Sequence, residues 1–534
     1  MVKYMDNNSG FNQWVENKQK AAKQSGTAKP SKFTGFLWWM VIFAAAWWLF
    51  SWWTAPKKTD IPVNAAEVAT IEDVASIPIS NINSDKIAAQ VQGLRISQIE
   101  LTDYTQDKNV DADKKVTLLS GTREFTEIGF LATGTTAPTS NTKWTTTPFL
   151  GANIMTWRNA DNVQFKRTVS VENYVITVTD EMTNKSAADV SFAPYARTVR
   201  AGSSENVAVA TGGIAYVNSD IERTDWKKLE KKPRAYQTVG GFVGFADQYW
   251  QTVVSIDTPD QTVRMKKVVD RYQADTSAAP VQIGAGKTAT VTTKIFAGPR
   301  DQSVLRDAAV SIPGLNQTID YGWFWFLSRP LLWSLNAIHS FVLNYGLAII
   351  LLTIALRVLM WPLTRKSYTS MAAMQKMQPE LQKIQKLYAN DKARQQMEMM
   401  KLYQTHKTSP MSGCLPMLLQ IPIFFGLYKA LLISVPMRGA GFLWISDLAV
   451  MDPYFILPIL MGATMWWQQS LQTAKAINSD SSDPMAQTQK IMKWMPIVFT
   501  FMFAWMPAGL VLYWTVSNLF GIGQMYVIKK SMKK

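Results

Sequence analysis

Soft metal ligands are almost missing from this chain. Its 534 residues include one cysteine, Cys414, and two histidines, His339 and His406. A single cysteine excludes a disulfide within the chain, and so few soft ligands argue against a Cys/His metal site. The chain also lacks a P-loop glycine motif, a GxSxG elbow and an HExxH motif. We therefore expect no enzyme, no catalytic residues, no metal site and no cofactor.

Charge and hydropathy divide the chain into different regions. The formal net charge is +16, which suits an anionic lipid surface, a nucleic acid or both. Residues from about 60 to 310 have the composition of a soluble domain, whereas 33–53 and 341–528 are rich in long apolar runs. The chain is too long for one ordinary domain. These patterns together predict a membrane protein with several domains.

One apolar run, Phe341–Leu363, carries a full charge. It is about as long as a membrane-spanning helix, which needs roughly 20 apolar residues. Arg357 lies near its C-terminal end, with Thr353 one helical turn earlier on the same face. Such a charge usually faces a protein interior or a wet cavity. The alternative is snorkelling, because Arg357 lies only roughly 9 Å from Leu363 along a helix and has a long side chain.

The N-terminal part is expected to be cytoplasmic and then membrane-spanning. Residues 1–32 are polar and lysine-rich, as in a cytoplasmic tail, and 33–53 form an apolar run dense in tryptophan. A cleavable signal peptide is the competing interpretation. The run is longer than a typical signal core and no clean small-x-small site follows it, so we favour an uncleaved signal anchor.

Residues 54–315 predict a large antiparallel β-sandwich. Alternation with period two is clear in 165–179, with a turn at Glu172 and Asn173, and similar patterns occur in 240–255 and 288–296. No long helical pattern interrupts them, which favours a sandwich that serves for folding or docking. Residues 316–340 follow, with an apolar stripe at helical spacing after Pro330. They predict an amphipathic helix that lies in the interface on the outer side of the same membrane.

A basic hairpin is predicted at 364–411. Residues 364–409 hold nine basic and three acidic residues, a net charge of +6, and an apolar seam rich in methionine. Two antiparallel helices fit this pattern best. The methionines either bind varied apolar segments or only pack the two helices of the hairpin against each other. The basic residues suit RNA phosphates or form a solvated face.

Four more spans are predicted at 413–433, 454–471, 494–506 and 508–528, followed by a basic tail at 529–534. Met506-Pro507-Ala508-Gly509 divides the last apolar stretch into two spans. The fold class is thus a multi-domain membrane protein: a helical bundle of six spans, five forming its core, with a large antiparallel β-sandwich on the outer side of the membrane. The positive-inside rule places both termini and the basic hairpin in the cytoplasm and the sandwich outside.

Polar side chains recur within these spans, but acidic ones are absent. The polar residues are Thr353, Arg357, Gln420, Thr464, Gln468, Thr500, Tyr513, Thr515 and Asn518. They suggest a polar cavity, although several threonines can equally serve to hold helices together. Without Asp or Glu in these spans, an ion-driven transporter is disfavoured, and duplicated halves are not evident.

Several motifs resemble the Gram-negative form of the YidC/Oxa membrane protein insertase family. In the helical part they are TIALRVLMWPLT, SYTSMAAMQKMQPELQKIQKLYAND, GCLPMLLQIPIFFGLYKAL, FLWISDLAVMDPYFILPILMGATM and WMPIVFTFMFAWMPAGLVLYWTVSNL. Upstream, KIFAGPRDQ and IDYGWFWFLSRPLLWSLNAIHSF are also similar to that family. The resemblance is strong over about 315–528 and weaker over the sandwich.

This resemblance implies a membrane protein insertase and folding chaperone of the cell inner membrane, acting alone or with the Sec translocon. It implies a β-supersandwich in the periplasm and a hydrophilic substrate groove that we expect to contain Arg357, Thr353, Gln420, Gln468, Tyr513, Trp514 and Asn518. A lipid-facing slide is expected around Ile354, Phe424 and Trp514, and hairpin contacts at Lys376, Met377, Lys383, Asp391 and Lys392.

The partners implied by the resemblance are nascent membrane proteins, the SecYEG/SecDF translocon, the ribosome, the targeting machinery and membrane lipids, with no small-molecule substrate. The chain departs from the family in its N-terminal extension, in a short C-terminal tail that weakens ribosome anchoring there, and in Trp514, where a tyrosine is usual. A small-solute transporter or channel, and a scaffold docked to the translocon, are the alternative functions.

Overall fold

Two antiparallel β-sheets and a set of C-terminal helices make up the computed structural model. It describes residues 77–531 apart from 108–110, 122, 150, 203–211, 390, 407–414 and 473–483. The tail predicted at 1–32 and the signal anchor predicted at 33–53 lie outside the described residues. The described residues belong to one unit, Asp60–Lys534.

The larger sheet has ten strands, all paired antiparallel. Its main path runs through β1 Ile79–Asn83, β2 Ile87–Gln92, β3 Arg95–Asp107, β5 Phe125–Thr133, β10 Val190–Arg200, β17 Arg271–Ala278, β16 Asp260–Val268 and β13 Arg234–Val239. Two strands lie off this path, β4 Asp111–Ser120 beside β3 and β18 Val281–Ile283 beside β10.

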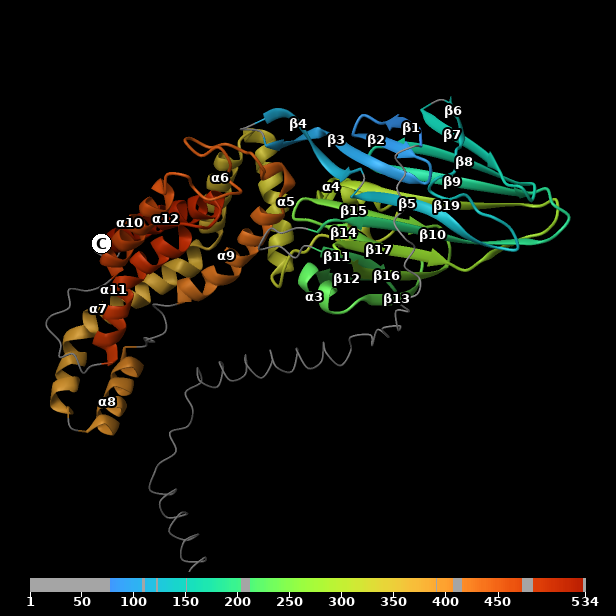
Figure 1. The fold of residues 1–534 in the computed structure, drawn as a ribbon. Coiled ribbons are helices and arrows are strands. Elements are labelled where there is room, and N and C mark those ends of the chain that lie inside the picture. Colours follow the sequence, from blue (N-terminus) through green and yellow to red (C-terminus); the bar gives the residue numbers. More distant parts are fainter. Residues whose placement is uncertain are drawn as a thin grey trace, which may run out of the picture. The chain divides into compact units, whose positions relative to one another are not determined.

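The second sheet has nine strands, also antiparallel. Its order is β12 Asp220–Asp225, β11 Gly212–Val217, β14 Phe242–Ala246, β15 Trp250–Ile256, β19 Thr288–Pro299, β9 Val175–Asn184, β8 Val163–Glu172, β7 Ala152–Arg158 and β6 Thr145–Phe149. Figure 1 shows these strands in teal to yellow-green, and the short helix α3, Trp226–Lys231, connects β12 to β13.

Alternating sequence explains how the two sheets form a sandwich. In β8 every second side chain is buried, from Val163 through Phe165 to Val169, as period two requires when one face meets a core. The predicted turn is confirmed: β8 and β9 form a hairpin, and Asn173 has a φ of 50° there. One apolar cluster with buried residues from both sheets forms the core.

Eight longer helices follow the sandwich in the described part of the chain. They are α5 Trp325–Val342, α6 Tyr345–Leu359, α7 Trp361–Leu387, α8 Lys392–Thr405, α9 Leu415–Ile433, α10 Ile456–Gln472, α11 Pro484–Phe503 and α12 Ala508–Ser531. Shorter turns are α4 Gln302–Ala308, η2 Leu315–Gln317 and η4 Val435–Met437. Figure 1 shows α7 and α8 side by side as an antiparallel hairpin.

The predicted span 341–363 contains α6 and the beginning of α7, with a bend between them. Pro362 lies in the first turn of α7 and has no N–H to continue the helix from α6. Within the described ranges no single helix is both long and apolar enough to cross a bilayer; α6 and Trp361–Ser370 suffice together, but they meet at 61°.

Candidate functional site

Arg357 contacts α12 through a serine. Its Nε donates to Ser517 Oγ at 2.8 Å, and its Nη2 donates to the same oxygen. Ser517 is buried, while Arg357 is partly buried in the last turn of α6. Within the described ranges no carboxylate forms an ion pair with Arg357, so its charge is stabilised there by neutral groups. Such a cation is suited to bind an acidic group.

A small cavity lies beside the guanidinium, between α6, α9 and α12. Its volume is about 10 Å³, which is room for about one water molecule. The lining residues are Thr353, Leu356, Arg357, Met360, Gln420, Ile423, Tyr513 and Ser517. Four residues predicted for the groove therefore meet here, namely Thr353, Arg357, Gln420 and Tyr513.

Two of these four bond to each other across the cavity. Gln420 Nε2 on α9 donates to the hydroxyl oxygen of Tyr513 on α12. Thr353 instead donates to the Ile349 carbonyl oxygen within α6, at 2.6 Å. The hydrogen bonds at Arg357 and Gln420 thus join α6 and α9 to one face of α12, since Tyr513 and Ser517 are four residues apart.

Two other predicted groove residues, Asn518 on α12 and Gln468 on α10, lie away from the cavity. Asn518 Nδ2 donates to Thr464 Oγ1 at 3.3 Å and to the Met461 carbonyl oxygen at 3.4 Å, both on α10. Gln468 packs on Gly521, where an added Cβ would lie 2.6 Å from Gln468 Nε2. Asn518 and Gln468 therefore join α10 to α12, and neither lines the cavity.

An aromatic cluster brings two of the three predicted slide residues together. Phe424 and Trp514 have ring centroids 5.1 Å apart, and both pack on Phe503 of α11. Trp514 points away from the cavity that Tyr513 lines, because the side chains of consecutive helical residues point about 100° apart around the axis. Ile354 is partly exposed on α6 and lies outside the apolar cluster that contains Phe424 and Trp514.

The predicted outer ends of α6 and α12 are covered by the loop between α9 and α10. Two of its carbonyls, at Leu448 and Val450, accept the N–H groups of Gly509 and Ala508 at 2.9 and 2.7 Å. Phe442 packs on Gly346 in the first turn of α6. The two carbonyls satisfy the first two N–H groups of α12, which have no partner inside the helix.

Three polar residues of the helical region, two of them at Arg357, were not anticipated from the sequence. Ser517 follows Tyr513 by four residues, a helical spacing that does signal a shared face. Gln524 is buried and its Nε2 donates to the Arg357 carbonyl oxygen at 3.3 Å. Lys429, in the predicted span 413–433, is a second cation besides Arg357. Its Nζ lies 2.7 Å from Asp320 Oδ2. Thus Arg357 is not the only cation in the predicted spans.

The hairpin residues singled out above differ in exposure. Lys376, Lys383 and Asp391 are exposed, whereas Met377 is buried. Asp391 also accepts the Arg394 N–H at 3.0 Å and thereby caps α8. Lys392 is the first residue of α8. Exposed Met397 and Met400 lie on α8.

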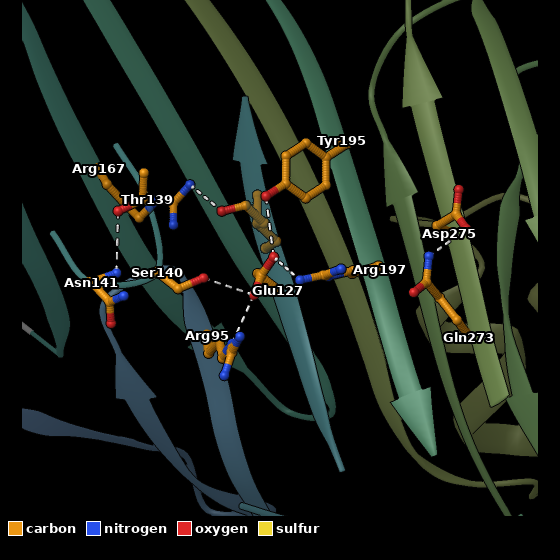
Figure 2. Close-up of polar contacts among 11 residues, drawn as sticks. Arg95, Glu127, Thr139, Ser140, Asn141, Arg167, Tyr195, Arg197, Gln273 and Asp275 are labelled. Atoms are coloured by element: carbon orange, nitrogen blue, oxygen red, sulfur yellow. Dashed lines mark hydrogen bonds and ion pairs between the residues drawn. The ribbon is translucent and has the colours of Figure 1, made fainter. Parts of the chain in front are cut away.

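A second polar cluster is buried within the sandwich. Glu127 on β5 lies directly opposite Arg95 on β3 and Arg197 on β10, with N–O distances of 2.7 Å to each. Ser140 and Tyr195 also donate to its carboxylate, at 3.0 and 3.1 Å. Figure 2 shows these four side chains converging on Glu127.

Charge decides the protonation state of Glu127. Burial alone would raise the pKa of its carboxyl group, but the Arg197 charge, the hydrogen bond and charge of Arg95 and the Ser140 hydroxyl hold that pKa below its ordinary value. Glu127 is therefore an ionised, fully paired structural group. No set of three or more His, Cys, Asp and Glu side chains suited to hold a metal occurs among the described residues.

Family comparisons cover nearly all of the described chain. Residues 80–334 match the family described as YidC periplasmic domain, and 337–534 match the family described as 60Kd inner membrane protein. The "Membrane protein insertase YidC" of Magnetococcus marinus is 37% identical over 455 residues, which are 81% of this chain and 80% of that protein.

Two other relatives carry the same name. The protein from Aeromonas hydrophila is 38% identical over 71% of this chain and 70% of its own length. The protein from Bradyrhizobium diazoefficiens is 34% identical over 88% of this chain and 84% of its own length. Fold and matches together define an inner-membrane protein with a periplasmic β-sandwich domain and a helical C-terminal region. The chain belongs to the YidC family, which confirms the resemblance found in its motifs.

Proposed function

We propose that this chain is a membrane protein insertase and folding chaperone of the cell inner membrane, and not an enzyme. The observation that carries the proposal is the Arg357 guanidinium, which faces a small polar cavity and has no described carboxylate partner. The names of the relatives support it. Its substrates are nascent membrane proteins, and insertion needs no cofactor.

The proposed topology has six spans, with both termini cytoplasmic. The spans are the signal anchor 33–53 and the segments 341–363, 413–433, 454–471, 494–506 and 508–528. The lysine-rich N-terminal tail, the basic hairpin and the basic C-terminal tail support this orientation, because positive loops stay on the cytoplasmic side. The segment 316–340, which contains most of α5, then lies in the periplasmic interface.

In the proposed mechanism, a short polar or acidic segment of the substrate enters the cavity from the cytoplasmic side. The cavity must widen for this, since it now holds about one water molecule. The positive charge of Arg357 offsets part of the cost of removing the acidic group from water. Separation of Gln420 from Tyr513 and of Arg357 from Ser517 would open it between α6, α9 and α12.

The apolar part of the substrate is proposed to leave along the lipid-facing side. Phe424 and Trp514 supply aromatic surface there, and Ile354 adds partly exposed aliphatic surface on α6. Transfer of apolar side chains from water into lipid drives release, so no nucleotide is required. Gln468 and Asn518 support this wall by holding α10 against α12.

We propose that the chain works both alone and with the SecYEG/SecDF translocon, and that the hairpin meets the ribosome and the targeting machinery. The exposed charges at Lys376 and Lys383 support an electrostatic contact with RNA phosphates. Asp391 and Lys392 lie where α8 begins, and the exposed Met397 and Met400 offer adaptable apolar surface.

The test uses the full chain in liposomes without SecYEG and a two-span substrate with an acidic outer segment. Protection of that segment from protease should appear with the wild type and disappear with Arg357→Ala. Arg357→Lys keeps the charge and should retain part of the activity. Equal protection with Arg357→Ala would remove Arg357 from the mechanism. No protection with any variant would favour a scaffold that depends on the translocon.

A further inference from the structure

Lys429 is an unexpected charge on an apolar helix. It lies four residues before the end of α9, and its Nζ is 2.7 Å from Asp320 Oδ2. The side chains are only 16% and 31% exposed, respectively. An ion pair with so little solvent contact is screened less than a surface pair and has a defined geometry.

Asp320 belongs to a segment that is held in place from several sides. Arg223 and Arg300 donate to the Thr318 carbonyl oxygen, at 3.3 and 2.7 Å. Gly322, with a φ of 74°, donates its N–H to Asp320 Oδ1 at 2.9 Å. An added Cβ on Gly322 would come within 3.2 Å of the Lys429 stem, so this segment lies directly on the lysine.

Electrostatics agree with this geometry. Burial alone would raise the pKa of Asp320, but the hydrogen bonds from Lys429 and the Gly322 N–H, together with the charges of Lys429 and Arg223, hold that pKa below its ordinary value. The carboxylate is therefore ionised at neutral pH and attracts the Lys429 ammonium group.

Opposite faces of α9 are thus fixed by different partners. Lys429 and Gln420 are nine residues apart, so their side chains point in directions about 180° apart around the helix axis and are separated by roughly 13 Å along it. Lys429 shares its face with Gly426, where an added Cβ would lie 3.1 Å from Leu327 of α5. On the other face Gln420 donates to Tyr513.

We propose that Asp320 and Lys429 are positioning residues: their ion pair ties the segment 318–322, which follows the sandwich, to α9 and thereby keeps the Gln420 side of α9 against α12. Opening of the cavity beside Arg357 then requires α9 to move against this tie. The effect on insertion rests on the proposed function, whereas the effect on the cavity does not.

The experiment measures access to the cavity without any substrate. Cys414 is replaced by serine, and Thr353→Cys places a single thiol in the cavity lining of the full chain in nanodiscs. The labelling rate by a small thiol reagent is then compared for Asp320→Asn, Lys429→Met and the double variant. Each single variant should label several-fold faster than the wild type. The double variant should label no faster than the faster single variant, because all three variants remove the same ion pair.

Matched controls separate this role from general destabilisation. Asp320→Glu with Lys429→Arg keeps both charges and should label nearly as slowly as the wild type. Lys86→Met removes an exposed sandwich lysine that pairs with Asp103 at 2.8 Å, and should leave the rate unchanged. If a single variant does not fold, the double variant, which leaves no unpaired charge, is compared with the wild type.

Two results would overturn the proposal. One is an unchanged labelling rate in the double variant. The other is a double variant whose rate increase equals the product of the two single increases, because the residues would then act independently. If labelling rises as expected but insertion of membrane proteins is unchanged, the positioning role holds and the proposed function of this cavity fails.

Discussion

Arg357 and Ser517 are 160 residues apart in the sequence, yet Arg357 Nε donates to Ser517 Oγ at 2.8 Å. The contact joins the end of α6 to the middle of α12. A buried serine is a neutral partner, so it orients the guanidinium without cancelling its charge. The cation stays available to an acidic group that enters the neighbouring cavity.

Ser517→Ala should reduce the insertion of substrates with acidic outer segments by roughly tenfold, which corresponds to about 1.4 kcal/mol. A hydrogen bond to a charged group is worth about 1.5–3 kcal/mol, and without it the guanidinium is free to turn toward the headgroups. Protease protection in liposomes measures the effect. Ser517→Thr keeps the hydroxyl and should insert almost normally. Full activity of Ser517→Ala would show that Arg357 needs no such partner.

Gly346→Ala should destabilise the protein by about 1–3 kcal/mol, the usual cost of overpacking. An added Cβ would lie 2.1 Å from Phe442 Cδ2, where the loop after α9 covers α6. The thermal unfolding midpoint in nanodiscs should fall, and Phe442→Ala should relieve part of the loss in the double variant.

Gly523→Ala is the matched control for Gly346→Ala. Gly523 is also helical, but nothing lies within 4 Å of the added Cβ. Alanine favours a helix over glycine by about 1 kcal/mol, so this change should be neutral or slightly stabilising. Equal midpoints for the two variants would mean that Phe442 does not pack tightly on α6.

Glu127→Gln should destabilise the sandwich by about 3–5 kcal/mol, because Arg95 and Arg197 remain buried without a carboxylate. The folded pKa of Glu127 is lowered, so its contribution is complete above the unfolded pKa of about 4.3. It is lost as the pH falls from there through the folded pKa. The variant should lack that acid-dependent loss.

Urea unfolding of the full chain between pH 7 and pH 3, followed by amide hydrogen exchange of β5, measures both effects. Glu181→Gln is the control, since Glu181 pairs with Lys166 at 3.1 Å on the exposed surface. It should cost at most about 1 kcal/mol. A parallel pH dependence in Glu127→Gln and the wild type would assign the acid sensitivity to other groups.

Local patterns predicted much of the fold. Period-two alternation is a property of the chain itself, so the hairpin of β8 and β9 with its turn near Asn173 was found without any contact information. Pairing between distant strands, such as β3 with β5 and β10, was not, because a strand's own pattern does not identify its neighbour. The bend at Met360 was also missed, although Pro362 signals it.

The sequence by itself determined the sandwich of alternating strands, the apolar helices, the position of Arg357 within one of them and the family. Tertiary structure alone decided which side chains meet: Ser517 and Gln524 at Arg357, Gln420 at Tyr513, and Asp320 at Lys429. Hydropathy and spacing in the sequence indicate the environment of each residue, but they do not identify its partner. A partner is selected only when helices distant in sequence pack and bring particular faces together.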